Sequence, residues 1–242
     1  MSFWLSEIGT NRRLTMAVIS TDDANKLWTL LDRLGHDLEP SILIGGWATQ
    51  FRVGGEISRD IDLIINSASL RSTLPRILHD YSENSHHGGD RKGRGSVHGI
   101  HVDAYFPHES RLGEKLRLDV AVLARHTDKE LVRGWLLLTP EAHLVTKCAA
   151  LLDRPDSEKG AKDAREIIAL LSTGVDGPRA IEILLSASSS TPEEVVDHLR
   201  TLFTLLPERG GANKALRRRL ADQRREWIDE AQRQIRREEN KT

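Results

Sequence analysis

The stretch GGWATQFRVGGEISRDIDLII, residues 45–65, decides the fold because it combines a glycine pair with two aspartates in an apolar run. Successive side chains of a β-strand point to opposite faces, so apolar residues such as Ile61 can enter a core. Asp60 and Asp62 then emerge side by side on the other face. Two carboxylates so close raise each other's proton affinity unless a cation lies between them. The stretch therefore predicts a strand whose polar face binds a cation.

The residues just before this strand predict a place for an anion. SILIGG, residues 41–46, has the pattern of a short buried strand that ends at Gly45 and Gly46, and a helix is expected from Trp47. Glycines let a phosphate approach the backbone, and the N-terminal end of a helix favours an anion. Mg²⁺ prefers oxygen ligands and bridges carboxylates to phosphates. Together the two halves predict a site for Mg²⁺ and a nucleoside triphosphate (NTP).

Composition limits the class of protein. With 242 residues, 38% hydrophobic and 29% charged, the chain has the make-up of a globular protein of one or two domains. A net charge of −1 argues against a surface devoted to nucleic acid. The single cysteine, Cys148, excludes an intramolecular disulfide and is expected in the core of an intracellular protein. Residues 1–20 lack the apolar run of a signal peptide, and no segment reaches the ~20 apolar residues of a membrane span, which predicts a cytoplasmic protein.

Residue patterns predict an α/β (α+β) fold, in which a small mixed β-sheet in residues 1–138 is followed by a helical domain in residues 139–242. Thr139-Pro140-Glu141 supports the boundary because it supplies a helix cap, a proline at the first helical position and an acid in the first turn. Strands are expected at 41–46, 60–66, 99–106, 116–124 and at an edge in 134–139. Helices are expected at 21–35, 47–55, 69–81, 140–153, 160–172, 177–186, 191–205 and 212–238, and a loop or hairpin tip at 84–99.

The order of these motifs resembles a known family. Gly45-Gly46-Trp47 followed by Asp60-Ile61-Asp62 resembles the pattern of the DNA polymerase β-like nucleotidyltransferase superfamily. RDIDLII, with the later TPEAHLVTKCAALLDR (139–154) and KDAREIIALL (162–171), is similar to the AbiEii type. These proteins are nucleotidyltransferase toxins of bacterial toxin–antitoxin and phage-defence systems. The resemblance covers about residues 40–172.

The resemblance implies transfer of a nucleoside monophosphate from an NTP to an acceptor hydroxyl, with release of pyrophosphate. It implies one or two Mg²⁺ ions as cofactor, the 3′ end of tRNA as acceptor, a block of translation as outcome and a cognate antitoxin as partner. Two alternatives stay open. One is a small-molecule acceptor, such as an aminoglycoside, or a protein side chain; the other is a non-catalytic nucleotide-binding module.

A third carboxylate is expected on a later strand. Asp103 in HVDAYF fits, because alternation places it with His101 and Tyr105 on a polar face. Asp119 in LRLDVAV is the alternative. Asp60 and Asp62 are predicted metal ligands. Together with them, such a carboxylate can hold two metal ions that activate the attacking hydroxyl and neutralise the leaving pyrophosphate.

The helical part contributes two further site residues through the resemblance. Lys147 lies on a mainly apolar helix face, and the family's TK motif implies that its ammonium binds the triphosphate; the alternative is a lysine that extends to solvent. The KD pair implies Asp163 in the active site, with Lys162 as a solvated neighbour. The alternative for Asp163 is a favourable acid in a helix's first turn.

Several other features each have two interpretations. Gly45 and Gly46 are predicted to bind phosphate. Arg59 either contacts the nucleotide or pairs with a nearby acid, and Trp47 either stacks on a base or packs in the core. The His- and Arg-rich residues 84–99 lack the ligand spacing of a zinc site, so this segment either contacts an acceptor nucleic acid or is an inert loop. The basic C-terminal helix is expected to be solvated, with RNA contact as the alternative.

Overall fold

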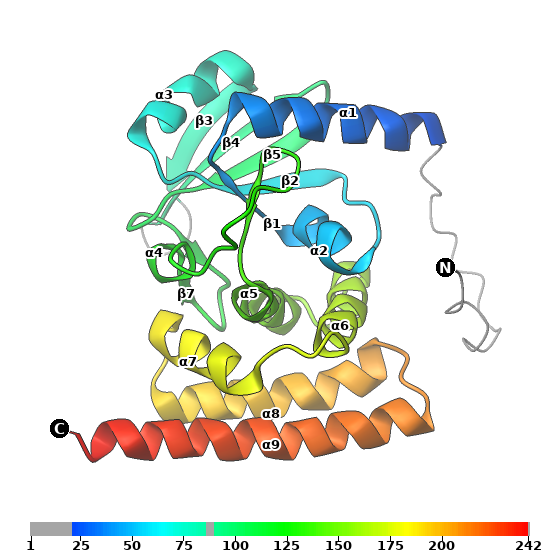
Figure 1. The fold of residues 1–242 in the computed structure, drawn as a ribbon, viewed down its shortest axis with the longest axis vertical. Helices are drawn as coiled ribbons and strands as arrows, with labels where there is room; N and C mark the ends of the chain where they lie inside the picture. The colour runs from blue at the N-terminus through cyan, green and yellow to red at the C-terminus, as the bar shows by residue number, and fades with distance from the viewer. Residues whose placement is uncertain (1–20, 86–89, 242) are drawn as a thin grey trace.

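The computed structural model of the chain describes residues 21–85 and 90–241 (Figure 1). It contains a six-stranded sheet with parallel and antiparallel pairs, followed in the chain by a helical region. This arrangement confirms the predicted α/β class. Residues 1–20, on which the expectation about a signal peptide rests, lie outside the described residues.

The sheet orders its strands as β3-β4-β5-β2-β1-β8, with β2 and β5 at its centre. β2 pairs antiparallel with β1 and parallel with β5, and β4 pairs antiparallel with both β5 and β3. β8 pairs with β1 at the far edge, which confirms the edge strand predicted in 134–139. The strands are β1 (Ile42–Ile44), β2 (Asp60–Ile64), β3 (His79–Ser85), β4 (Arg91–Val97), β5 (Ile100–Tyr105) and β8 (Leu136–Leu137), with β6 (Arg111–Leu112) and β7 (Leu118–Asp119) in a separate ladder.

Side-chain caps satisfy free amides in the first turn of the helices that follow the sheet in the chain. In each helix from α5 to α9, the residue before the helix accepts a hydrogen bond from a backbone N–H. No helix in the described part of the chain is long and apolar enough to cross a membrane. The helices are α1 (Thr21–Asp37), α2 (Gly45–Val53), α3 (Ala68–Ile77), α4 (Val120–Leu123), α5 (Pro140–Asp153), α6 (Glu158–Leu171), α7 (Gly177–Ala187), α8 (Pro192–Arg209) and α9 (Lys214–Glu239).

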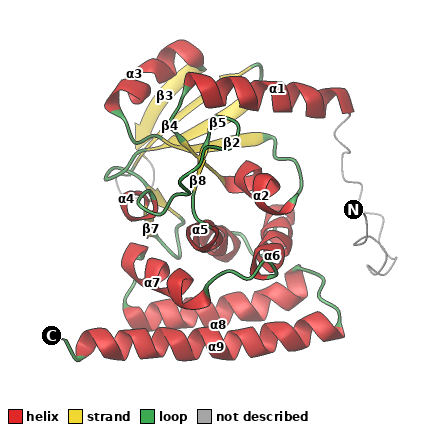
Figure 2. Ribbon diagram, viewed as in Figure 1, coloured by secondary structure: helices red, strands yellow, loops and turns green. Residues whose placement is uncertain are grey.

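The two faces of the sheet bury different hydrophobic clusters. On one face, strand residues such as Ile61 and Leu63 share a cluster with residues of α1 and α3, which lie above the sheet in Figure 2. On the other face, Ile42 and Ile64 share a cluster with α5 to α9. Because β2 alternates, this second face also carries Asp60 and Asp62. The sheet face that meets the helical region is therefore apolar toward β1 and acidic toward β5.

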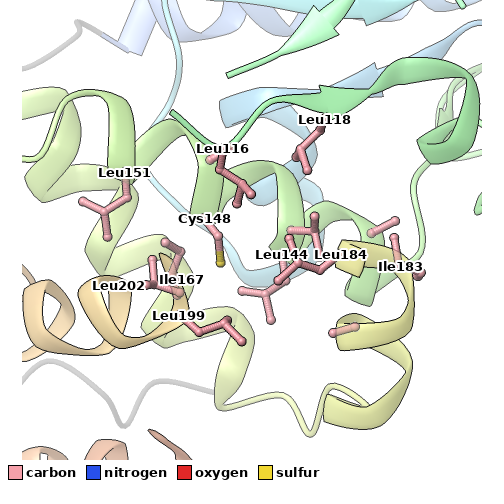
Figure 3. Close-up of a cluster of buried hydrophobic side chains, with 14 of the residues drawn as sticks. Leu116, Leu118, Leu144, Cys148, Leu151, Ile167, Ile183, Leu184, Leu199 and Leu202 are labelled. Carbon is pink, nitrogen blue, oxygen red and sulfur yellow. The ribbon is translucent and has the colours of Figure 1, made fainter. Parts of the chain in front are cut away.

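Cys148 lies in the cluster beneath this second face (Figure 3). Its sulfur is surrounded by apolar side chains such as Leu116 and Ile167, and burial raises the pKa of the thiol to about 12. The thiol therefore stays protonated and unreactive at neutral pH. The prediction of a core cysteine is confirmed.

The strand predicted at 116–124 is wrong beyond Asp119. Its first half contains β7, but the Asp119 side chain then accepts a hydrogen bond from the backbone N of Ala121 at 2.7 Å and begins α4. An aspartate that caps a helix competes with strand formation at that point. Apolar residues of this turn, such as Leu123, are buried in either conformation, so hydrophobicity alone could not distinguish them.

The loop predicted at 84–99 is wrong over residues 91–97, which form β4. Gly93 gives the reason: a Cβ on Gly93 would lie 2.8 Å from the Tyr81 hydroxyl oxygen, so glycine here permits close packing instead of a turn. Residues 86–89, the predicted tip, lie outside the described residues.

Several helix ends also differ from expectation. The helix predicted at 69–81 is α3, which ends at Ile77, because residues 79–85 form β3. α2 begins at Gly45 rather than Trp47, and Gly45 has a φ of +68°, which glycine adopts without strain. α8 continues through Pro207 to Arg209, beyond the predicted end at residue 205. A proline near a helix end removes one backbone donor only, and the buried apolar face of α8 outweighs that loss.

Candidate active site

Three aspartates lie together on one face of the sheet. Asp60 and Asp62 are two positions apart on β2, and the β2–β5 register pairs Asp62 directly with Asp103. Paired residues of adjacent strands point to the same face. Asp119 instead lies in the separate β6–β7 ladder, where it pairs with Arg111 at 3.3 Å. The structure thus brings Asp103, not Asp119, beside the two aspartates of β2.

Asp62 is held in an environment that disfavours its negative charge. Burial and then the charge of Asp103 raise the pKa of Asp62 to about 6, although Lys92 and Lys147 act in the opposite direction. No ion pair with Asp62 occurs within residues 21–85 and 90–241. Asp60 is more exposed and pairs with Lys159 at 3.0 Å. The pair of aspartates therefore has charge that a bound cation would stabilise.

The glycine pair brings α2 against Asp62. A Cβ on Gly45 would overlap Oδ2 of Asp62, and one on Gly46 would lie 2.8 Å from the Cβ of Ser58. Gly45 therefore permits close contact between the start of α2 and Asp62 of β2, and Gly46 permits close contact with Ser58 in the segment before β2. Their predicted role in binding phosphate stays a prediction.

A buried hydrogen-bond chain supports the start of α2. The Thr49 hydroxyl donates to the carbonyl oxygen of Gly45 at 3.2 Å, and Nε2 of His143 lies 2.9 Å from the same hydroxyl. Burial, then Lys147 and Arg52, lower the pKa of His143 well below its ordinary value. The imidazole is therefore neutral, and its Nε2–H donates to Thr49. His143 was not predicted as a site residue, although it lies in α5 among apolar residues, four positions after the capping residue Thr139.

Strand β4 places two cations beside Asp103. The Lys92 ammonium forms an ion pair with Asp103 and donates a hydrogen bond to the Tyr105 hydroxyl at 3.0 Å. Nε of Arg94 lies 3.4 Å from Oδ1 of Asp103. Burial, then Asp62 and Asp103, raise the pKa of Tyr105 well above its ordinary value, so this hydroxyl stays protonated. These cations were missed because residues 91–97 were predicted to be a loop; alternation along a strand would have revealed them.

Lys147 lies in a buried network between α5 and α6. It is 5% exposed, and its ammonium lies 2.5 Å from Glu166 and 3.4 Å from Asp163. Asp163 also binds Arg154 at 2.8 Å. A surface lysine and a first-turn acid are therefore the wrong alternatives for Lys147 and Asp163. Glu166 was missed, although its position three residues after Asp163 puts both acids on one helix face.

Lys162 is a second correction in this region. It was expected to be a solvated neighbour, but its side chain is only 19% exposed and lies 3.8 Å from Glu166. It also donates a hydrogen bond to the backbone carbonyl of Glu56 at 3.1 Å. Lys162 thus links α6 to the segment before β2, whereas Asp163 pairs with Lys147 of α5 and with Arg154 at its C-terminal end.

The remaining predicted residues are less central. Trp47 is fully buried, and its ring packs edge-on against Trp28 with 4.9 Å between the ring centroids. The packing interpretation is therefore confirmed, and stacking of Trp47 on a base is excluded. Arg59 is exposed next to Asp60, and its predicted contact with a nucleotide stays a prediction.

A cleft of about 400 Å³, large enough for a small molecule, has Lys92 and Tyr105 in its lining, whereas Asp60, Asp62 and Asp103 do not line it. Lys92 and Tyr105 form the wall nearest to Asp103. The rest of the lining carries both signs of charge. It consists of Asp90, Arg91, Ser110, Arg111, Leu112, Gly113, Glu114, Arg117 and Asp153.

The donor set fits a magnesium ion at Asp60 and Asp62. No group of three or more His, Cys, Asp or Glu side chains in the described ranges has the arrangement of a metal centre. Two carboxylates on one strand face, one with a raised pKa, nevertheless supply the hard oxygen ligands that Mg²⁺ prefers. Mg²⁺ commonly takes only one or two carboxylates and completes its shell with water and phosphate oxygens.

Without divalent metal, Asp62→Asn is expected to be more stable than the parent at pH 7.5. An acid whose pKa is raised by folding destabilises the folded state once it ionises, so stability falls as pH rises from about 4 to about 6. The expected gain is about 3 kcal/mol at pH 7.5 and small at pH 4, where Asp62 of the folded parent is neutral like the asparagine. Urea unfolding in EDTA measures the difference in free energy of unfolding between the variant and the parent. An equal difference at both pH values would contradict the raised pKa of Asp62.

No protein-family model matches the chain, and no curated protein matches its sequence. Among solved structures, it is similar to an antigenic nucleotidyltransferase-like protein from Paracoccidioides brasiliensis, with 18% identity, a TM-score of 0.47 and coverage of 80% of this chain and 93% of that one. It is also similar to the antibiotic-resistance factor ANT(2″)-Ia, with 15% identity, a TM-score of 0.46 and coverage of 68% of this chain and 91% of that one. For the Thermotoga maritima CCA-adding enzyme in complex with tRNA, the identity is 11%, the TM-score is 0.29, and the match covers 77% of this chain and 52% of that one. Because these TM-scores are below 0.5, the similarities carry no argument about the function of this chain.

Proposed function

We propose that the protein is a Mg²⁺-dependent nucleotidyltransferase, which transfers a nucleoside monophosphate from an NTP to an acceptor hydroxyl and releases pyrophosphate. The observation that supports this most is the register that pairs Asp62 with Asp103 on the face that also carries Asp60. Carboxylates converging from two adjacent parallel strands, next to a helix N-terminus and a charge-lined cleft, suit a metal-bound phosphate ester.

In this proposal the chain's own residues bind and orient the reactants. Asp60 and Asp62 would hold the Mg²⁺, and Asp103 would act as a further ligand or as the base for the acceptor hydroxyl. When bound, Mg²⁺ lowers the pKa of a coordinated hydroxyl and neutralises charge on phosphate oxygens. The free amides at the start of α2, at Gly45 and Gly46, would donate hydrogen bonds to phosphate oxygens.

Lys147 would add positive charge beneath the triphosphate. Its ammonium already lowers the pKa of Asp62 through space, which supports a position close to the site. It is paired with Glu166 and Asp163, so direct contact with a phosphate would require it to exchange one of these partners. Asp163, held by Arg154, would then act by positioning Lys147.

For the acceptor, we propose the 3′ end of tRNA, modified by a cytoplasmic toxin that a cognate antitoxin controls. The resemblance of RDIDLII, the TK motif and the KD motif to the AbiEii type supports this role. A small-molecule acceptor is the second candidate. Its support is the cleft of about 400 Å³ lined by Lys92, which pairs with Asp103, since single small molecules occupy cavities of this size.

The deciding experiment supplies the purified protein with Mg²⁺, total tRNA and each labelled NTP in turn, and measures both labelled product and pyrophosphate. We expect label on tRNA with one preferred nucleotide, and none without Mg²⁺. A parallel reaction replaces tRNA with a panel of hydroxyl-bearing aminoglycosides. Label there instead would support the small-molecule acceptor.

Absence of Mg²⁺-dependent pyrophosphate release with every acceptor would argue against nucleotidyl transfer and for the non-catalytic alternative. The biological part is tested separately by induced expression in bacteria. Growth arrest by the parent, but not by Asp62→Asn, is the expected outcome. Equal arrest by both would contradict a toxin that acts through this site.

A further inference from the structure

We infer that Lys92 is a built-in cation that neutralises Asp103, so that the acidic face binds one divalent ion, at Asp60 and Asp62, instead of two. This inference rests on the proposed function, because it concerns the metal of the same site. It gives a role to Lys92, a residue that the sequence motifs do not include.

Strand pairing directs Lys92 into the site. β4 pairs antiparallel with β5, with Lys92 opposite Tyr105 and Arg94 opposite Asp103. All four side chains therefore share the face that carries Asp62. Lys92 reaches diagonally across the pair to Asp103, a separation that a long side chain can span.

Burial makes the position of this ammonium specific. The Lys92 side chain is only 10% exposed, and a buried charge is tolerated only when it is paired and hydrogen-bonded. Asp103 supplies the opposite charge, and the Tyr105 hydroxyl accepts a hydrogen bond at 3.0 Å. The Tyr105 ring, with its centroid 4.7 Å away, adds a cation–π contact. A second metal ion bound to Asp103 would have to displace this ammonium or share the carboxylate with it.

The other cation at Asp103 is weaker. Arg94 is half-exposed and lies 3.4 Å from the carboxylate, so solvent screens its charge more strongly. By contrast, Asp62 has no ion-pair partner within the described ranges, and Asp60 has only the exposed Lys159. The uncompensated negative charge is therefore concentrated on β2, where a single ion would bind.

The position of Lys92 also affects how the acceptor hydroxyl would be activated. Lys92 lines the cleft and also forms the ion pair with Asp103, which does not itself line the cleft. In a site with two metal ions, the ion on the acceptor side would activate the hydroxyl. Here the Lys92 ammonium would stand at Asp103 in place of that ion.

The test counts metal ions at equilibrium without nucleotide or activity. Full-length protein is titrated with Mn²⁺, and free Mn²⁺ is followed by electron paramagnetic resonance. We expect one ion per chain for the parent and two for Lys92→Met, which keeps the length of the side chain but removes its charge. Loss of a nearby positive charge should also tighten the first ion by about tenfold or more. Lys92→Arg, which keeps the charge, should still bind one ion.

Arg111→Met is the matched control, because Arg111 lines the same cleft but pairs with Asp119. It should bind one ion with the parent's affinity. Two ions in the parent, or one in a folded Lys92→Met, would overturn the inference while leaving the metal site intact. No Mn²⁺ binding by the parent would overturn both this inference and the metal-dependent function. The parent's stoichiometry decides the matter even if Lys92→Met does not fold.

Discussion

Asp62→Asn is expected to lower the kcat for pyrophosphate release by about 10³-fold, because a neutral amide replaces the carboxylate that lies closest to Gly45 and Asp103. Asparagine has almost the same shape, so the loss reports charge and not packing. The measurement is steady-state pyrophosphate release with saturating NTP and the acceptor that the labelling experiment identifies.

The matched control is Asp119→Asn. Asp119 undergoes the same chemical change but lies in the separate β6–β7 ladder, and an asparagine can still cap α4. We expect nearly parental kcat for this variant. A reversed result, with Asp119→Asn inactive and Asp62→Asn active, would show that the third carboxylate and the metal site were wrongly located. Because Asp62→Asn is also expected to gain stability in EDTA, its loss of activity cannot be attributed to unfolding.

Lys147→Met is expected to lower the free energy of unfolding by about 3 kcal/mol. Methionine fits the volume of the lysine stem, but among the described residues Glu166 then keeps only Lys162, at 3.8 Å, and Asp163 keeps only Arg154 as ion-pair partners. Glu166 is 4% exposed, and its carboxylate lies 2.5 Å from the Lys147 ammonium. Removal of its main counter-ion therefore leaves a buried charge without compensation. Urea denaturation at neutral pH measures the effect.

The double variant Lys147→Met with Glu166→Gln separates structure from function. It removes both charges, so we expect it to recover more than half of the lost stability. If its kcat remains low when stability has returned, Lys147 acts on the reactants in addition to packing. Equal instability of the single and double variants would contradict the ion pair as the cause.

The helices and the central acidic strand could be predicted because their signals are local. Thr139 and its successors show a cap, a first-turn proline and an acid within three residues, and α5 begins there. The alternation from Asp60 to Ile64 likewise lies within one strand. Local signals failed at Gly93, where a residue typical of turns is explained by its approach to Tyr81, a neighbour on another strand.

The same distinction holds for the site. Sequence alone determined that Asp60 and Asp62 share a face and that a glycine turn precedes them, because the geometry of a single strand or turn dictates both. Only the tertiary structure decided that Asp103 pairs with Asp62, that Lys92 neutralises Asp103 and that Glu166 holds Lys147. These contacts depend on strand register and helix packing between segments far apart in the chain. No local pattern encodes them, because they arise only when those segments are brought together by burial of a common core.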